Sequence, residues 1–241
     1  MNDIGHMKQP KKTTPDAAEA AGDRGDVTRQ KLLNAAIDVF GHYGFDGTTT
    51  RALASAAGVN LQAIPYYFGG KEGLYLAAAD HLATMISSHV SGRRQQVQAR
   101  LAEIQSEGRA VTRDEARELL TSLLHTLAEV MVSEKSRAWA RFLIREQMEP
   151  TEAFARVYES VMRPMIEAIR RLVGILLDDE PTSEHVRLRA ISLIGSVMVF
   201  RVANAAALRQ LEWSEIGPRE FNAICALITE IVHALDRRGQ K

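Results

Sequence analysis

Residues 49–68 are TTRALASAAGVNLQAIPYYF, and the spacing of small and apolar side chains in this stretch decides the fold of the N-terminal region. Leu53 and Ala57 fall on one face of a first short helix, and Gly58 follows where a tight turn favours a residue without a Cβ. Ile64 is placed to bury a second short helix. The pattern favours a helix-turn-helix, and an ordinary helical hairpin is the alternative.

Apolar residues recur at helical spacing on both sides of this stretch, and no segment alternates as a β-strand does. The expected helices cover residues 27–43, 51–57, 61–67, 71 to beyond 91, 112–132, 137–147, 150–177 with a kink at Pro164, 183–208 and 218–237. We therefore predict an all-α chain in three parts. These are a disordered tail over 1–26, a helix-turn-helix domain over 27–72 and a C-terminal helical domain over 73–241.

The composition argues against several classes of protein. The 241 residues carry 30 Lys and Arg against 30 Asp and Glu, so a nucleic-acid site would have to be a local patch. The single cysteine, Cys225, cannot form an internal disulfide, and the uncharged apolar stretch 190–200 is too short to span a membrane. The seven histidines lack metal-site spacing, and no catalytic motif is present. We expect a cytoplasmic protein with no metal, cofactor, membrane partner or enzymatic activity.

Residues around the helix-turn-helix repeat the pattern of a known family. They are Ala35-Ala36, Phe40, Gly44-Phe45, Thr48-Thr49-Thr50, Leu53-Ala54, Ala57-Gly58-Val59, Tyr66-Tyr67-Phe68, Lys71-Glu72 and Leu74. Together they resemble the DNA-binding domain of TetR-family repressors. The stretch 144–151, IREQMEPT, and Arg163-Pro164 beyond it resemble the CecR (YbiH) branch of that family. The resemblance implies a homodimer whose N-terminal three-helix domain binds operator DNA and whose C-terminal bundle holds an effector pocket and the dimer interface.

Seven residues are candidates for contacts with double-stranded operator DNA: Thr50, Arg51, Gln62, Ala63, Tyr66, Tyr67 and Lys71. Thr50 and Arg51 open the first short helix, where a hydroxyl, a guanidinium and backbone amides can hold phosphate oxygens. Gln62 and Ala63 begin the second helix, where glutamine can pair with adenine and a methyl group can touch thymine. The two tyrosines offer hydroxyl groups, and we expect Tyr67 and Lys71 to clamp phosphates.

Pro65 departs from the family pattern, which often has Tyr or Thr at this position. Proline has no N–H to donate to the Leu61 carbonyl, so we expect the second short helix to be shortened or bent. The charge of the N-terminal unit is also modest, with four basic against two acidic residues in the range 27–71. Both features support an alternative, a helical architectural or protein-interaction dimer without a ligand switch.

The effector site is expected where aromatic, methionine and arginine side chains recur on neighbouring C-terminal helices. The candidates are Trp139, Phe142, Arg145, Tyr158, Met162, Arg163 and Arg201. A stripe of aromatic and methionine residues fits core packing as well as a cavity. A buried arginine needs a partner, which for Arg163 and Arg201 is either Glu146 or an anionic group of a small-molecule effector.

The dimer interface is expected on the last two long helices. Small residues on the helix over 183–208 suit close packing across a two-fold axis, and the final helix supplies apolar partners. The candidates are Ser192, Gly195, Ser196, Ala203, Leu227 and Ile231. We interpret the chain as a ligand-responsive, homodimeric repressor. The resemblance further implies release from the operator by a small apolar or amphipathic effector and control of exporter or drug-tolerance genes.

Overall fold

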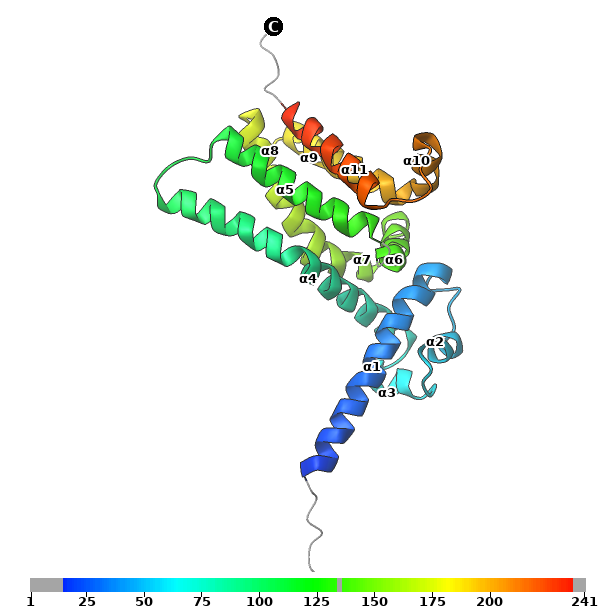
Figure 1. Ribbon diagram of the computed structural model, residues 1–241. Coiled ribbons are helices and arrows are strands. Elements are labelled where there is room, and N and C mark those ends of the chain that lie inside the picture. The colour runs from blue at the N-terminus through cyan, green and yellow to red at the C-terminus, as the bar shows by residue number, and fades with distance from the viewer. Residues whose placement is uncertain (1–14, 134–135, 236–241) are drawn as a thin grey trace, which may run out of the picture.

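The computed structural model describes residues 15–133 and 136–235, and every regular element in these ranges is helical. Because no strand occurs in them, the expected all-α class is confirmed. The first four helices are α1 (Pro15–Tyr43), α2 (Thr50–Ala57), α3 (Ala63–Phe68) and α4 (Lys71–Ser106). Figure 1 shows α2 and α3 beside α1 at one end of the molecule, with α4 leading from them into a helical bundle.

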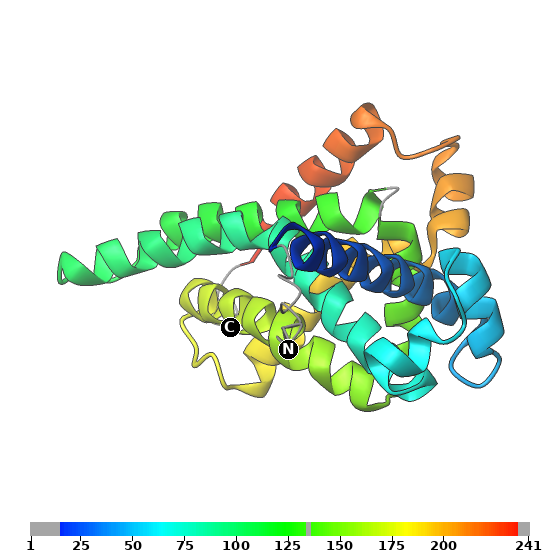
Figure 2. The same cartoon turned by 90° about the horizontal axis from the view of Figure 1, so that it is seen from below.

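The bundle contains the rest of the described chain. Its elements are α5 (Arg113–Val132), α6 (Arg137–Met148), α7 (Glu152–Val157), a π-helical turn (Tyr158–Met162), α8 (Arg163–Leu177), α9 (Glu184–Val202), α10 (Asn204–Leu211) and α11 (Pro218–His233). Helix α5 packs against α4, α8, α9 and α11, while α6 packs against α1. Figure 2 shows the far end of α4 projecting beyond the other helices. Two bundle elements, α4 and α6, therefore meet the N-terminal helices.

Helix α1 begins earlier than the sequence pattern predicted. We expected residues 1–26 to be a disordered tail, but residues 15–26 belong to α1. Proline is tolerated in the first turn of a helix, and the following Ala-Ala-Glu-Ala-Ala, residues 17–21, consists of strong helix formers. Residues 1–14 of the expected tail lie outside the described ranges.

The helix expected over residues 150–177 is irregular just before Pro164, where a kink was expected. One turn of π-helix, Tyr158–Met162, separates α7 from α8, and Pro164 lies in the first turn of α8. A proline in a helix interior would lose one backbone hydrogen bond and clash with the preceding turn. A π-helical turn is wider than an α-helical one, and it leaves Pro164 at a position where its missing N–H costs little.

The helix expected over residues 183–208 is two helices. It breaks at Ala203, and α9 and α10 are bent by 84° relative to each other. Asn204 Nδ2 donates to the Phe200 carbonyl at 3.1 Å, which gives that acceptor a side-chain partner in place of the next helical N–H. No single described helix is long and apolar enough to cross a membrane, and only the bent α9–α10 pair meets those criteria when joined.

The start of α4 lies so close to the end of α3 that one position excludes a side chain. A Cβ on Gly73 would lie 1.9 Å from the Phe68 carbonyl oxygen, whereas a Cβ on Gly92 in the same helix would meet nothing within 4 Å. We expect Gly73→Ala to lower the free energy of unfolding by about 1–3 kcal/mol through this overlap. Gly92→Ala should raise it by up to about 1 kcal/mol, because alanine is the better helix former.

Urea denaturation of the two variants measures both changes. Equal effects at the two positions would show that the α3–α4 junction has room for a side chain.

Candidate nucleic-acid interface and effector cavity

Local hydrogen bonds fix the two helices of the helix-turn-helix. Thr49 Oγ1 accepts from the Ala52 N–H at 3.1 Å and caps α2. Gly58 ends α2 with a φ of 62°, a left-handed conformation that glycine adopts without strain. The Val59 N–H then donates to the Ala54 carbonyl at 3.0 Å, which closes the turn. Leu53 and Ile64 are fully buried beneath it.

Pro65 shortens α3 and does not interrupt it. The helix begins at Ala63, two residues later than expected, so that Pro65 is its third residue. The Leu61 carbonyl, which an N–H at position 65 would have used, accepts from the Ile64 N–H at 3.3 Å. The Asn60 side chain caps the preceding turn by accepting from the Gln62 N–H at 2.9 Å. A proline in the first turn removes no bond within the helix.

The candidate DNA contacts come together around α3. Tyr66 is 80% exposed, and Arg51 and Gln62 are exposed as well, while Thr50, Ala63, Tyr67 and Lys71 are half-buried. The Tyr67 ring meets Tyr66 edge-on at 4.7 Å between centroids. The Lys71 ammonium lies 4.3 Å from the centroid of the Phe45 ring. Leu61, which was not among the predicted contacts, also has an exposed apolar side chain beside Gln62.

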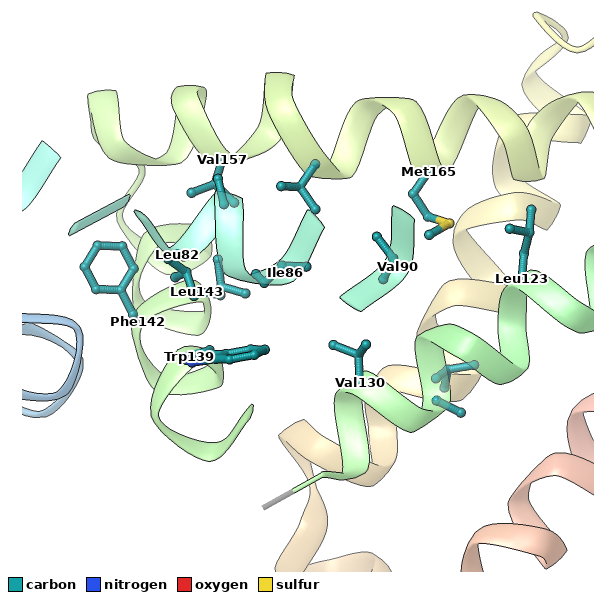
Figure 3. Packing of buried hydrophobic residues seen from close by; sticks show 14 of the residues in the cluster. Leu82, Ile86, Val90, Leu123, Val130, Trp139, Phe142, Leu143, Val157 and Met165 are labelled. Carbon is teal, nitrogen blue, oxygen red and sulfur yellow. The ribbon is translucent and has the colours of Figure 1, made fainter. Parts of the chain in front are cut away.

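A second site lies inside the bundle, in a cavity of about 290 Å³ lined by helices α4 to α9. Figure 3 shows side chains around it from α4 (Ile86, Val90), α5 (Val130), α6 (Trp139, Leu143) and α8 (Met165). Its lining is almost entirely apolar, and among the lining residues that the structure describes Arg201 is the only charged one. The aliphatic part of this wall could not be predicted from the sequence, because aliphatic residues at helical spacing look the same in any core.

Three of the seven expected effector residues line this cavity, namely Trp139, Met162 and Arg201. Arg201 does not pair with Glu146, which corrects one of the two expected partners. Its guanidinium donates to the carbonyls of Met131 and Ser133 and, at 2.9 Å, to Ser136 Oγ. It therefore stabilises the C-terminal end of α5, where helix carbonyls lack partners and a positive charge is favourable.

The other four expected effector residues lie elsewhere. Arg163 forms an exposed ion pair with Glu159 at 2.6 Å and lies against the half-buried Tyr158 ring. Phe142 and Arg145 are on the side of α6 that meets the N-terminal helices. The Phe142 ring is 5.2 Å from the Tyr75 ring, and Arg145 Nη2 lies 3.5 Å from the His42 carbonyl.

Glu146 is a charged residue buried at this junction, with 2% of its surface exposed. It accepts from Tyr75 Oη, from the Thr151 N–H at 3.1 Å and Oγ1 at 2.8 Å, and from the Phe154 N–H at 2.9 Å. The carboxylate thereby caps α7. Burial, and then the Glu146 carboxylate, raise the pKa of Tyr75, so this phenol remains a hydrogen-bond donor at neutral pH.

The expected dimer residues lie on partly or fully exposed surfaces. Ser192 and Gly195 are exposed on α9, and Leu188, Ile191, Val199 and Val202 extend the same face with exposed apolar side chains. Ser196 and Ala203 are half-buried, and Ser196 Oγ donates to the Leu193 carbonyl of its own helix. On α11, Leu227 is exposed and Ile231 is half-buried. The pattern predicted the small residues of this face, and it missed the aliphatic ones.

Comparisons with known proteins identify the family of the chain. The family of bacterial regulatory proteins described as the tetR family matches residues 32–78. The C-terminal domain of the HTH-type transcriptional dual regulator CecR matches residues 116–236, half of the chain. The chain belongs to the TetR family of transcriptional regulators. Proteins of this family are regulators and not enzymes, and the resemblance to the CecR branch is confirmed. In residues 15–133 and 136–235, no group of three His, Cys, Asp or Glu residues could hold a metal.

Individual relatives support the assignment. CecR of Shigella flexneri is 29% identical over 206 residues, which are 86% of this chain and 90% of CecR. The repressor AcnR of Corynebacterium glutamicum is 40% identical over 72 residues, 30% of this chain and 38% of AcnR. A solved TetR-family regulator from Streptomyces coelicolor superposes with a TM-score of 0.61 at 14% identity, covering 94% of this chain and 98% of its own. The last comparison shows the shared fold.

The environments of two arginines predict different consequences of losing each charge. Arg201→Met removes charge-assisted hydrogen bonds to the end of α5 and should lower the free energy of unfolding by about 1.5–3 kcal/mol. Arg163→Met breaks an exposed ion pair and should change it by less than about 0.5 kcal/mol. Thermal and urea denaturation of both variants provide the measurement. A similar loss of stability in both would contradict the exposed position of Arg163.

Proposed function

We propose that this TetR-family regulator is a cytoplasmic, ligand-responsive repressor that a small molecule releases from its operator. The observation that carries the proposal is the apolar cavity, because α4 and α6 both line it and both pack against the DNA-binding unit. Relatives support each half of the proposal. AcnR is named as a repressor, and AibR, with a TM-score of 0.59 at 13% identity over 85% of this chain and 97% of its own, was solved with isovaleryl coenzyme A and operator DNA.

The lining of the cavity supports a proposal for the class of effector. A volume of about 290 Å³ and aliphatic walls favour a compact apolar molecule. Ser136, Gln147 and Arg201 are the polar lining residues, so we expect at most one or two polar groups on the ligand and no positive charge. Export of such compounds, or tolerance to them, is the function that the family resemblance suggests for the regulated genes.

In this proposal α3 reads the major groove of operator DNA. The exposed Gln62 and the Ala63 methyl group contact base edges, while Thr50, Arg51, Tyr66, Tyr67 and Lys71 hold phosphates. The alternative of an architectural dimer without a ligand switch loses one of its supports, because Pro65 leaves α3 intact from Ala63 onward. A mobility shift with genomic fragments, with and without apolar compounds, tests the proposal. Retention of DNA at every compound concentration would favour the alternative.

Two substitutions separate base reading from phosphate contact. Gln62→Ala should weaken operator binding by about 1–3 kcal/mol and relax the preference at one base pair, with little effect on random DNA. Lys71→Ala should weaken binding to operator and random DNA alike and reduce the salt slope by about 1 per subunit. Binding measured at several salt concentrations distinguishes them. An unchanged slope in Lys71→Ala would remove this lysine from the phosphate contacts.

We propose that the dimer forms through the exposed face of α9 together with α11, as is typical of the family. The small residues Ser192, Gly195, Ser196 and Ala203 allow helices to approach closely, and Leu227 and Ile231 add apolar area. A glutamate at Val199, which is 44% exposed on this face, would be buried without a partner in the dimer.

Val199→Glu should therefore produce monomers in sedimentation at concentrations where the wild type is dimeric. The matched control is Val27→Glu on α1, where the valine is 50% exposed in the N-terminal unit. This control should remain dimeric. If Val199→Glu stays dimeric, the interface lies on another surface.

A further inference from the structure

Helix α6 faces the cavity on one side and the DNA-binding unit on the other. Trp139, Ala140 and Leu143 line the cavity. Further along the same helix, Arg145 contacts the C-terminal end of α1, and Glu146 contacts the first turns of α4. A ligand that presses on the first group of side chains acts on the same rigid helix that carries the second. The contacts of Arg145 and Glu146 therefore determine which neighbouring helix a displacement of α6 is transmitted to.

The two junction contacts differ in strength. Arg145 Nη2 lies 3.5 Å from the His42 carbonyl, at the edge of hydrogen-bonding distance and near the last turn of α1. The Glu146 carboxylate is buried and accepts from Tyr75, Thr151 and Phe154. Since a buried carboxylate that loses a donor is left with an unsatisfied charge, the Glu146 contacts resist separation much more than the Arg145 contact does.

Tyr75 connects Glu146 to the DNA-reading end of α4. It lies four residues after Lys71, so both side chains fall on the same face of the first two turns of this helix. Its ring packs against Phe45 at 5.2 Å and against Phe40 at 4.7 Å between centroids, and Lys71 lies over the same Phe45. A movement of the Tyr75 side chain therefore reaches Phe45, the start of α4 and the adjoining α3.

From these contacts we infer that the hydrogen bond between Glu146 and Tyr75 couples the effector cavity to the DNA-binding unit. This inference rests on the proposed function. When the cavity fills, α6 is displaced, and Glu146 carries Tyr75 and the first turns of α4 with it because its carboxylate stays hydrogen-bonded. Glu146 and Tyr75 act as positioning residues, since neither touches the ligand or DNA. The Glu146 carboxylate also accepts hydrogen bonds from the N–H groups of Thr151 and Phe154, and these bonds keep α7 attached to it as it moves.

A double-mutant cycle tests the coupling without knowledge of the natural effector. Ala140→Leu adds three carbon atoms on the cavity side of α6 and imitates occupancy. Tyr75→Phe removes only the hydroxyl and keeps the ring packing. In the full-length protein, Ala140→Leu should weaken binding to a retained genomic fragment by about 5-fold or more. In the Tyr75→Phe background the same change should weaken it by less than about 2-fold.

The matched control is Asp80→Asn. Asp80 on α4 pairs with Arg156 on α7 at 2.7 Å, which is another contact of α4 with the bundle and is exposed to solvent. In this background Ala140→Leu should keep its full effect, because an exposed ion pair contributes little. Circular dichroism and melting curves confirm that each variant is folded. If Ala140→Leu does not fold, saturation of the cavity with N-phenyl-1-naphthylamine, a neutral apolar probe, replaces it as the perturbation.

The outcomes separate the two proposals. If the wild type retains no DNA, the proposed function fails. If it binds DNA and the effects of Tyr75→Phe and Ala140→Leu simply multiply, the regulator stands and the coupling through Glu146 is overturned. The same holds if filling the cavity leaves DNA binding unchanged. Loss of the Ala140→Leu effect in Tyr75→Phe but not in Asp80→Asn is the result that supports the inference, because a general loosening of the contact between α4 and the bundle would affect both backgrounds.

Discussion

The buried carboxylate of Glu146 is the contact on which the relation between the two parts of the molecule depends. Its acceptor oxygens hold a side chain of α4 and the N-terminal end of α7 from a position on α6. An isolated charge at 2% exposure would be strongly unfavourable, so the three elements are stable only in the arrangement that supplies these donors. The apolar contacts around it, such as Phe142 against Tyr75, bury additional apolar surface but do not fix the relative orientation of the helices. The polar contact therefore gives the junction one defined geometry, and the aromatic contacts give it stability.

The N-terminal unit could be predicted from sequence because its signals are local. The Thr49 cap, the left-handed Gly58 and the buried Ile64 each act within a few residues of their partners. The cavity could not be predicted in this way. Trp139 and Phe142 are three residues apart on one helix, yet the first lines the cavity and the second lies at the junction, and only the position of α1 decides between them. Long-range packing is not encoded in the spacing of apolar residues along one helix.

The arginines show the same limit of sequence reasoning. Arg163 and Arg201 both follow apolar residues, and a pattern treats them alike. In the structure, the π-helical turn before Pro164 leaves Arg163 at the surface beside Glu159. Arg201 lies where α5 ends and takes the carbonyls that a helix terminus leaves without partners. The spacing identified Arg201 as a residue that needs acceptors, but the acceptors are backbone atoms, which side-chain chemistry alone does not indicate.

The cavity and the exposed face of α9 share residues, so the proposed ligand binding and the proposed assembly would involve the same helix. Ile191, Gly195 and Val202 line the cavity and also lie on the apolar face assigned to the dimer. A side chain added at Gly195 would therefore act on both sites, and its effect could not be attributed to either. Val199 lies on the same face of the helix but is not part of the cavity lining. Because the two surfaces overlap along one edge of α9, a ligand that displaces this helix alters the surface presented to a second copy. In the proposed dimer, α9 would link the interface to the occupancy of the cavity, while the inferred coupling runs from the same cavity through α6 and Glu146 to the DNA-binding unit.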